Sequence, residues 1–196
     1  MARVDEIREE TTRLVVLERW DKYEPRVKIT LAQAVVKSKK MDDIIHKATE
    51  LGVITIIPVI SVRTIVRLGD KAQKKVERWK KISREAAKQD KSCSVPSIWQ
   101  PIDLKKLIME GKEERKLLLC EHRGKYLKEI LLDIESSKEL PSSVQVLVGA
   151  EGGWTEEEEK YILKNSYEAI SLGRKILRAE TAALSSLAMI DHFWNS

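Results

Sequence analysis

The sequence predicts an α/β fold in which a mostly parallel sheet is flanked by helices. Over residues 27–196, short apolar runs alternate with segments whose apolar residues recur at helical spacing. The clearest run, residues 53–60, is rich in β-branched side chains and has the length of a strand that a parallel sheet buries on both faces. No internal repeat or low-complexity linker interrupts the alternation, so we expect one α/β domain here.

The first half of this domain is predicted to hold two strands and two helices in alternation. In the first helix, Ile44, Ile45, Ala48 and Leu51 recur at helical spacing, and Gly52 follows as a natural C-cap. The second helix carries its apolar stripe among many basic residues. The expected order is strand, helix, strand and helix at residues 27–31, 41–51, 53–60 and 70–89.

The second half continues the pattern. Thr155, with Glu158 three residues later, forms the signature of a capping box that opens a helix through about residue 164. The last helix is rich in Ala, Leu and Met, a composition that fits either a protein interface or an ordinary core. Strands are expected at 116–120, 144–148 and 169–172, and helices at 125–132, 155–164 and 180–194.

Residues 1–26 differ in character from the rest. They contain one apolar run, residues 14–17, and are predicted to form one or two strands that are too short for an independent core. Pro25 marks a boundary, because proline fixes its own φ and favours an extended preceding residue. We therefore expect two units, a short N-terminal β segment at 1–26 and the α/β domain at 27–196.

Composition excludes several classes of protein. The 196 residues are 42% hydrophobic and 34% charged, which excludes a disordered chain, a collagen and a disulfide scaffold. No uncharged apolar stretch approaches the roughly 20 residues that cross a bilayer, and the first residues lack an apolar signal core. The sequence predicts a cytoplasmic protein without a membrane span, in which Cys93 and Cys120 are free thiols.

The positive charge is concentrated in one segment. Residues 61–91 hold eleven Lys and Arg against four Asp and Glu, a local excess of +7, whereas the whole chain carries +5. The rest of the chain is therefore mildly acidic. A Lys-rich segment of this kind is either a solvated helix face or a phosphate-binding surface, and charge alone leaves both interpretations open.

Three expected strand ends carry the residues best suited to bind a ligand. In parallel sheets, ligands bind where the carboxyl ends of strands and their loops meet. Gly149, Gly152, Gly153 and Gly173 are four of the eight glycines, and they let the backbone approach a ligand closely. These loops follow the strands at 116–120, 144–148 and 169–172, and span 120–122, 149–153 and 173–181.

Other motifs are absent or ambiguous. The spacing matches neither the P-loop nor the Gly-x-Gly-x-x-Gly dinucleotide motif, and the histidines and cysteines lack zinc spacing, so no metal is expected. Glu121-His122 is either an acid–base pair or a polar strand end. The acidic run at 156–159 suits a helix N-terminus, where carboxylates complement the helix dipole.

Four ordered segments resemble one family. Residues 47–53 (KATELGV), 84–89 (REAAKQ), 147–153 (LVGAEGG) and 171–182 (SLGRKILRAETA) together are similar to the RsmE family of 16S ribosomal RNA uridine-N3 methyltransferases, within the SPOUT superfamily. The resemblance covers about residue 27 to the C-terminus. It implies a SPOUT-type fold with a C-terminal trefoil knot, S-adenosyl-L-methionine as methyl donor and a homodimer.

The resemblance also implies roles for residues in the three loops. The cofactor is expected to contact backbone and apolar groups of Leu119, Gly149, Gly152, Gly153, Leu172, Gly173, Ile176 and Leu177. Arg178 is expected to stabilise the anion formed as uracil N3 loses its proton, an effect of about 2.7–4 kcal/mol by analogy with an oxyanion donor. Glu151 or Glu180 is the expected base, directly or through water, and Glu180 has the alternative role of capping the last helix.

The expected partner is 16S rRNA or the small ribosomal subunit. The RNA-binding residues are expected to be Arg63, Arg67, Arg78, Lys81, Arg84 and Lys88. The chain departs from the family at Ala150, where proline is usual, and near Ser92, where arginine is common. Residues 1–26 resemble only the last strands of the family's N-terminal RNA-binding β-barrel. Two alternatives therefore stay open, a weakly active or non-catalytic RNA-binding SPOUT protein and an α/β enzyme that uses another nucleotide cofactor.

Overall fold

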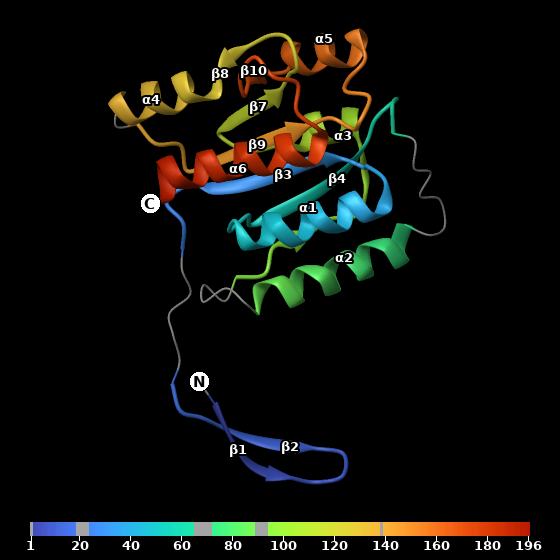
Figure 1. Cartoon of the computed structure of the whole chain (residues 1–196), viewed down its shortest axis with the longest axis vertical. Helices are drawn as coiled ribbons and strands as arrows, with labels where there is room; N and C mark the ends of the chain where they lie inside the picture. Colours follow the sequence, from blue (N-terminus) through green and yellow to red (C-terminus); the bar gives the residue numbers. More distant parts are fainter. Residues whose placement is uncertain (1, 19–23, 65–71, 89–93, 138) are drawn as a thin grey trace.

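A parallel sheet of eight strands forms the centre of the computed structural model, which describes residues 2–18, 24–64, 72–88, 94–137 and 139–196 (Figure 1). The strand order is β5-β4-β3-β9-β7-β10-β8, and β6 also pairs with β4. Every pairing within this sheet is parallel, which confirms the predicted α/β class. The strands are β3 (Lys28–Ala34), β4 (Thr55–Ile60), β5 (Ser97–Ile98), β6 (Ile102–Asp103), β7 (Arg115–Leu119), β8 (Lys125–Tyr126), β9 (Ser143–Val148) and β10 (Glu168–Ser171).

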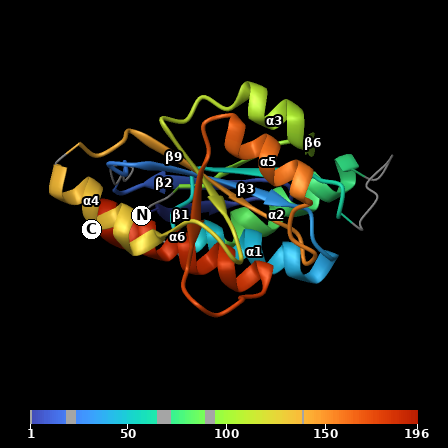
Figure 2. The same ribbon diagram turned by 90° about the horizontal axis from the view of Figure 1, so that it is seen from above.

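Helices cover both faces of the sheet. Figure 2 shows α3 and α5 on one side of the strands and α1, α4 and α6 on the other. The longest of the described helices, α6, packs alongside β3 and β9 (Figure 1). The helices are α1 (Ser38–Glu50), α2 (Ala72–Ala87), α3 (Leu104–Glu110), α4 (Leu127–Ser137), α5 (Glu156–Lys164) and α6 (Ala179–Asn195). None of the helices that the structure describes is long and apolar enough to cross a membrane.

Successive residues of the central strands enter two different cores. Leu31 packs with α1 and α6, whereas its neighbour Ala32 packs on the opposite face with α3 and α5. Leu117 and Leu118 divide in the same way. Because side chains alternate across a strand, a continuous apolar run supplies both cores at once, and this explains why the strands lack polar alternation.

Local signals define the helix ends as expected. Thr155 accepts a hydrogen bond from the backbone N–H of Glu158, and Glu158 accepts one from the backbone N–H of Thr155, so the capping box is complete. Gly52 follows the C-cap of α1 with φ of +74°, a conformation that suits glycine. Both predictions are confirmed.

The structure differs from the predictions in its small elements. Residues 125–126 form the short strand β8, so the helix expected from 125 begins at Leu127. The two-residue strands β5 and β6 and the seven-residue helix α3 were not predicted. Such short elements carry too few residues to establish a period, although Asp103, which caps α3 by accepting from Lys105 N at 2.9 Å, was a usable signal.

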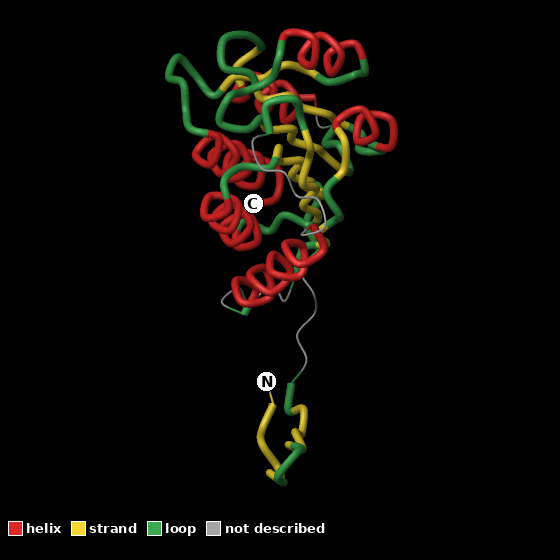
Figure 3. The backbone as a smooth tube through the Cα atoms, turned by 90° about the vertical axis from the view of Figure 1, so that its right-hand side faces the viewer, coloured by secondary structure: helices red, strands yellow, loops and turns green. Residues whose placement is uncertain are grey.

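Two antiparallel strands form a separate N-terminal hairpin, which Figure 3 shows apart from the α/β domain. They are β1 (Ala2–Ile7) and β2 (Thr12–Val16). All their side chains are exposed except that of Glu6, which is partly buried. The expectation of one or two N-terminal strands without a core of their own is therefore confirmed.

Candidate active site

A pocket of about 570 Å3 lies at the carboxyl ends of β7, β9 and β10. These three strands are neighbours and parallel, so the loops that follow them meet at one edge of the sheet. Its lining includes every residue expected to contact the cofactor: Leu119, Gly149, Gly152, Gly153, Leu172, Gly173, Ile176 and Leu177. The strand-end argument therefore predicted the position of the pocket.

The loop after β9 forms a tight turn against the pocket. Gly153 has φ of +67°, and its backbone N–H donates to the carbonyl of Ala150 at 2.9 Å. A Cβ atom at Gly149 would lie 3.2 Å from Gly153 Cα and 3.3 Å from Trp154 Nε1, closer than side-chain carbons ordinarily approach. Ala150, at the family's usual proline position, is buried within this turn.

Gln33 supports this loop from within the sheet. Its side chain is fully buried, and Nε2 donates to the carbonyl oxygens of Gly149 at 3.0 Å and Ala34 at 2.9 Å. A buried amide needs such partners, because an unpaired polar group inside the protein is destabilising. Gln33 was not predicted to belong to the site, although a glutamine between Ala32 and Ala34 was a usable signal of a buried polar contact.

Glu158 joins the same region to the loop after β4. Its Oε1 accepts from the backbone N–H of Val62 at 2.8 Å, while Oε2 completes the capping box of α5. The next residue, Arg63, donates from Nη1 to the carbonyl oxygen of Gly152. Arg63 therefore lines the pocket, away from the helix to which the basic segment was assigned.

The loop after β7 adds a buried thiol. Cys120 Sγ donates to Glu159 Oε1 at 3.3 Å, and Arg123 Nε lies 2.7 Å from the same oxygen. Burial, followed by the contact with Glu159, raises the pKa of Cys120 to about 12, so the group is a neutral thiol at ordinary pH. The neighbouring Glu121 and His122 are exposed and lie 3.7 Å apart at the edge of the pocket.

The three expected catalytic residues come together on one side of the pocket. Arg178 and Glu151 line it, and Glu180 lies beside it in the first turn of α6. Lys40 joins the two acids, with Nζ 3.2 Å from Glu180 Oε2 and 3.6 Å from Glu151 Oε1. The sequence analysis did not select Lys40, because its contacts are with residues more than a hundred positions away.

Glu180 is held as a carboxylate. Burial alone would raise its pKa, but a hydrogen bond from its own backbone N–H and the positive charges of Lys40 and Arg178 outweigh that effect. The net result is a pKa below the ordinary value for glutamate, so Glu180 is ionised at neutral pH. Glu180 also lies in the first turn of α6, where a carboxylate complements the helix dipole, whereas the N-cap position is Arg178, which makes no side-chain capping hydrogen bond.

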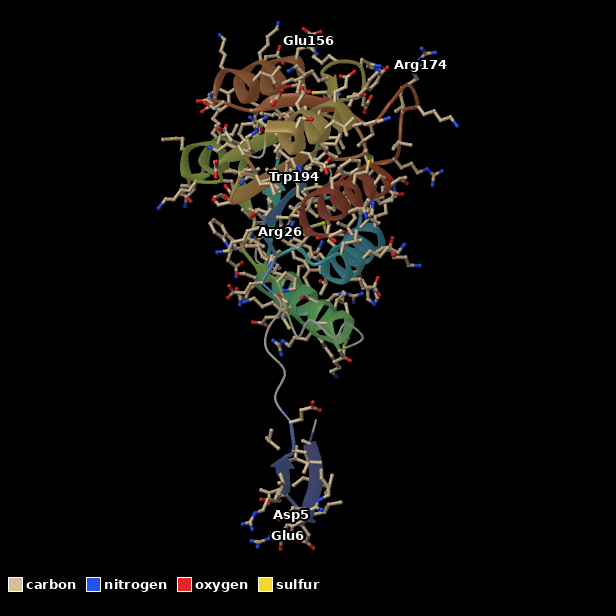
Figure 4. All side chains as sticks on the ribbon, turned by 90° about the vertical axis from the view of Figure 1, so that its left-hand side faces the viewer. Asp5, Glu6, Arg26, Glu156, Arg174 and Trp194 are labelled. Atoms are coloured by element: carbon tan, nitrogen blue, oxygen red, sulfur yellow. The ribbon has the colours of Figure 1, made fainter. Side chains whose placement is uncertain are left out.

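The other expected RNA-binding residues lie outside the pocket. Arg78, Lys81 and Arg84 are exposed on α2, and Lys88 follows its last turn. Arg78 pairs with Asp42 at 2.6 Å and Lys88 with Glu85 at 2.8 Å. Arg67 lies outside the described residues. At the opposite end of the molecule, Arg174 projects from the loop between β10 and α6 (Figure 4).

No three His, Cys, Asp or Glu side chains gather as a metal site within the described part of the chain. The pocket instead offers backbone groups, apolar side chains and separate charges of both signs.

Comparison with known proteins gives a consistent match. Residues 22–191 match the family model described as the RNA methyltransferase domain. The chain is 35% identical to the ribosomal RNA small subunit methyltransferase E of Bacillus subtilis, over 85% of this chain and 66% of that protein. It is also 35% identical to the Aquifex aeolicus protein of the same name, over 86% of this chain and 70% of that protein.

The chain is shorter than these relatives. It spans about two thirds of the B. subtilis protein and about half of a Synechocystis relative, of which 66% and 52% are covered.

Two solved structures resemble the whole chain. A Legionella pneumophila structure described as a methyltransferase with bound S-adenosylmethionine aligns with a TM-score of 0.87 and 29% identity, over 97% of this chain and 77% of that one. The structure of the ribosomal RNA small subunit methyltransferase E of Neisseria gonorrhoeae, bound to S-adenosylmethionine, aligns with a TM-score of 0.82 and 31% identity. The alignment covers 98% of this chain and 78% of that one. With the family match over most of its length and these relatives, the chain belongs to the RNA methyltransferase family that includes the ribosomal RNA small subunit methyltransferase E proteins.

Proposed function

We propose that this chain methylates N3 of a uracil in small-subunit ribosomal RNA with S-adenosyl-L-methionine as methyl donor. The observation that carries the proposal is the pocket, in which the three glycine-rich or strand-end loops meet Glu151 and Arg178, with Glu180 beside them in the first turn of α6. Its volume of about 570 Å3 suits a nucleoside-sized ligand, since small-molecule sites usually measure roughly 300–1,000 Å3.

The residues present fit this cofactor. Leu119, Leu172 and Leu177 offer half-buried apolar surface for an adenine ring, and Gly149 keeps the backbone open where a Cβ would crowd Gly153 and Trp154. When bound, S-adenosylmethionine supplies an electrophilic methyl group, whose transfer to nitrogen leaves the bonding electron pair on sulfur. The Legionella and Neisseria relatives hold that molecule in their structures, which supports the assignment.

The remaining chemistry falls to the charged residues. Uracil N3 must lose a proton, so the site needs a proton acceptor and a cation near the ring oxygens that gain negative charge. Arg178 is an exposed cation at the pocket, suited to stabilise that charge, and Glu180 or Glu151 is suited to accept the proton. Arg63 borders the same space through its contact with Gly152.

We assign RNA contacts to the basic face of α2. Lys81 and Arg84 are exposed there, and Arg78 and Lys88 form ion pairs that RNA phosphates can replace at little cost. We also assign residues 1–26 to an N-terminal RNA-binding β unit, since their exposed hairpin has no core of its own. A homodimer through α6, whose Met189 and Phe193 are partly buried, completes the proposal.

Methyl transfer tests this function directly. The chain is incubated with radiolabelled S-adenosylmethionine and either naked 16S rRNA or small ribosomal subunits, and the digested nucleosides are separated. We expect 3-methyluridine. Cofactor binding by calorimetry without methyluridine on either substrate would instead favour an RNA-binding protein of the same fold, and absence of cofactor binding would favour a different nucleotide ligand.

A further inference from the structure

Lys40 is the only described cation that contacts two of the proposed catalytic side chains. It lies in the first turn of α1, whereas Glu151 follows β9 and Glu180 opens α6. One ammonium group therefore joins three segments of the chain beside the pocket. The side chains are 32%, 26% and 18% exposed, respectively, so the cluster is only partly open to solvent.

We propose that Lys40 is a positioning residue, which holds the carboxylates of Glu151 and Glu180 together so that one of them can take the N3 proton of the target uracil. This inference rests on the proposed function. In the proton step, the N3–H bond breaks, its electron pair stays on the nitrogen, and the proton forms a bond to a carboxylate oxygen.

Electrostatics explain why a cation is needed at this place. Two carboxylates that share one side of a half-buried pocket repel each other, and the usual result is that one of them binds a proton and loses its capacity as a base. An ammonium group shared by both carboxylates offsets their repulsion. It also fixes the direction in which both side chains point. The backbone N–H of Lys37, 3.4 Å from Glu151 Oε1, supports the same orientation.

The cluster has a defined set of charged neighbours. Arg178 lies two positions before Glu180 in the chain. Its positive charge, together with Lys40, lowers the pKa of the Glu180 carboxyl. The remaining charged or titratable groups that line the pocket are Lys175, in the same loop as Arg178, and, from other elements, Arg63, Cys120, Glu121, His122, Arg123 and Glu159. Glu159 is already paired with Arg123, so Lys40 is the partner specific to the two acids.

The test compares Lys40→Met, Lys40→Arg and the control Lys39→Met. Lys39 lies in the same turn of α1, is exposed, and forms no ion pair or hydrogen bond with a described residue. With saturating S-adenosylmethionine and small-subunit RNA, we expect kcat of Lys40→Met to fall roughly 10- to 100-fold, less than the roughly 100- to 10,000-fold loss of a whole acid–base group, because Lys40 acts through the carboxylates. The acid limb of its pH profile should move up by about one unit, because loss of a nearby cation favours the protonated carboxyl.

Two further readouts separate this role from a merely structural one. The cofactor dissociation constant, measured by calorimetry, should change less than about threefold in Lys40→Met, and Lys40→Arg should restore most of kcat and the wild-type pH profile. Lys39→Met should behave as the wild type. A wild-type pH profile in Lys40→Met, or a loss confined to cofactor binding or thermal stability, would overturn the proposal.

An NMR titration of the Glu180 side-chain carboxyl tests the same inference without RNA and without an activity measurement. We expect its pKa to rise in Lys40→Met and to stay low in Lys40→Arg. An unchanged pKa in Lys40→Met overturns the inference even if methyl transfer is found. If the wild-type chain transfers no methyl group, the proposed function fails, and the titration still reports whether Lys40 controls Glu180.

Discussion

The pocket and the exposed face of α2 both carry many charges, but they arrange them differently. In the pocket, Glu159 and Glu180 meet cations from other segments, and these acids are 15% and 18% exposed. In the pairs of Arg78, on α2, and Lys88, directly after it, the basic side chains are 63% and 69% exposed, against 53% for Arg123 and 32% for Lys40 in the pocket pairs. The pairs in the pocket join different segments of the chain to one another. Exposed surface pairs typically contribute only about 0–1 kcal/mol to the free energy of unfolding.

Substitutions in the two regions should therefore differ in their effects. Those in the pocket should each disturb one particular contact or step, whereas those on α2 should add up. A residue that joins two loops of the pocket has a defined geometry, so its loss should alter one step of the reaction or one contact. A residue on α2 contributes mainly its charge, so neighbouring residues should substitute for one another in binding a polyanion. The following experiments test that division.

The largest effect is expected for Arg178→Ala. Removing the cation that we propose faces the developing uracil anion should lower kcat by about 100- to 1,000-fold, the effect of deleting one oxyanion donor. Steady-state methyl transfer and cofactor calorimetry measure it, and the cofactor dissociation constant should stay within a few-fold of wild type. Arg174→Ala is the matched control, since Arg174 is exposed in the same loop and does not line the pocket. Equal turnover in the two variants would contradict the role of Arg178.

The next effect concerns Glu158, which is 9% exposed. Glu158→Ala should lower the free energy of unfolding by about 1–3 kcal/mol, because it leaves two backbone N–H groups without their acceptor. Cofactor affinity should fall as well, since the loop carrying Arg63 loses its attachment. Denaturant unfolding and calorimetry measure the two effects.

Glu157→Ala provides the control for that experiment. Glu157 occupies the same first turn of α5 but is exposed and contacts no described residue through a hydrogen bond or ion pair. If Glu158→Ala and Glu157→Ala lower the free energy of unfolding equally, the loss comes from the helix dipole. The hydrogen bond from Val62 N–H to Glu158 then contributes nothing.

A smaller effect is expected for each exposed cation of α2. Lys81→Ala and Arg84→Ala should each reduce the slope of log affinity for RNA against log salt by about 0.7–0.9, the contribution of one phosphate contact. Cofactor affinity should not change, because neither residue lines the pocket. Filter binding over a series of salt concentrations measures the slope, with Lys112→Ala, in an exposed position before β7, as control. A loss of affinity without a change in slope would argue against a phosphate contact.

The last prediction concerns the reactivity of the Cys120 thiol, which has no expected effect on methyl transfer. It is measured in a chain that carries Cys93→Ser. Only the thiolate reacts with maleimide, and a pKa of about 12 lowers the thiolate fraction at pH 8 roughly 1,000-fold below that of an ordinary thiol, so labelling should be much slower. The rate should keep rising with pH beyond 9, because the group loses its proton only near its raised pKa. Levelling of the rate near pH 9 would show that Glu159 and burial do not hold the proton.

The sequence predicted the parts of this fold that depend on local pattern. The capping box at Thr155, the C-terminal glycine of α1 and the glycine-rich ends of β9 and β10 are each recognised from residues within a few positions of one another. The family resemblance added Leu119, Leu172, Ile176 and Leu177 to the expected lining. The trefoil knot and the homodimer stay predictions.

Contacts between distant segments were beyond such reasoning. Gln33 reaches Gly149 across 116 positions, Glu158 reaches Val62 across 96, and Lys40 reaches both Glu151 and Glu180. The sequence marks some of these side chains, such as Glu158 of the capping box, but only the packing of the sheet gives each its distant partner. The contact of Arg63 with Gly152, 89 positions away, is of the same kind.

The pairing of β3 with β9 also has a consequence for how the chain folds during synthesis. β3 is the first strand of the sheet to leave the ribosome, yet its neighbour β9 begins more than a hundred residues later, where Ser143 aligns with Lys28. At translation rates of roughly 5–20 residues per second that interval lasts on the order of 10 s. Until it ends, β3 can pair only with β4, and its other edge, on a strand whose side chains beyond Lys28 are all buried in the folded protein, is open to association with other chains. That edge is protected only when β9, the strand that precedes the glycine-rich loop at 149–153, has been synthesised.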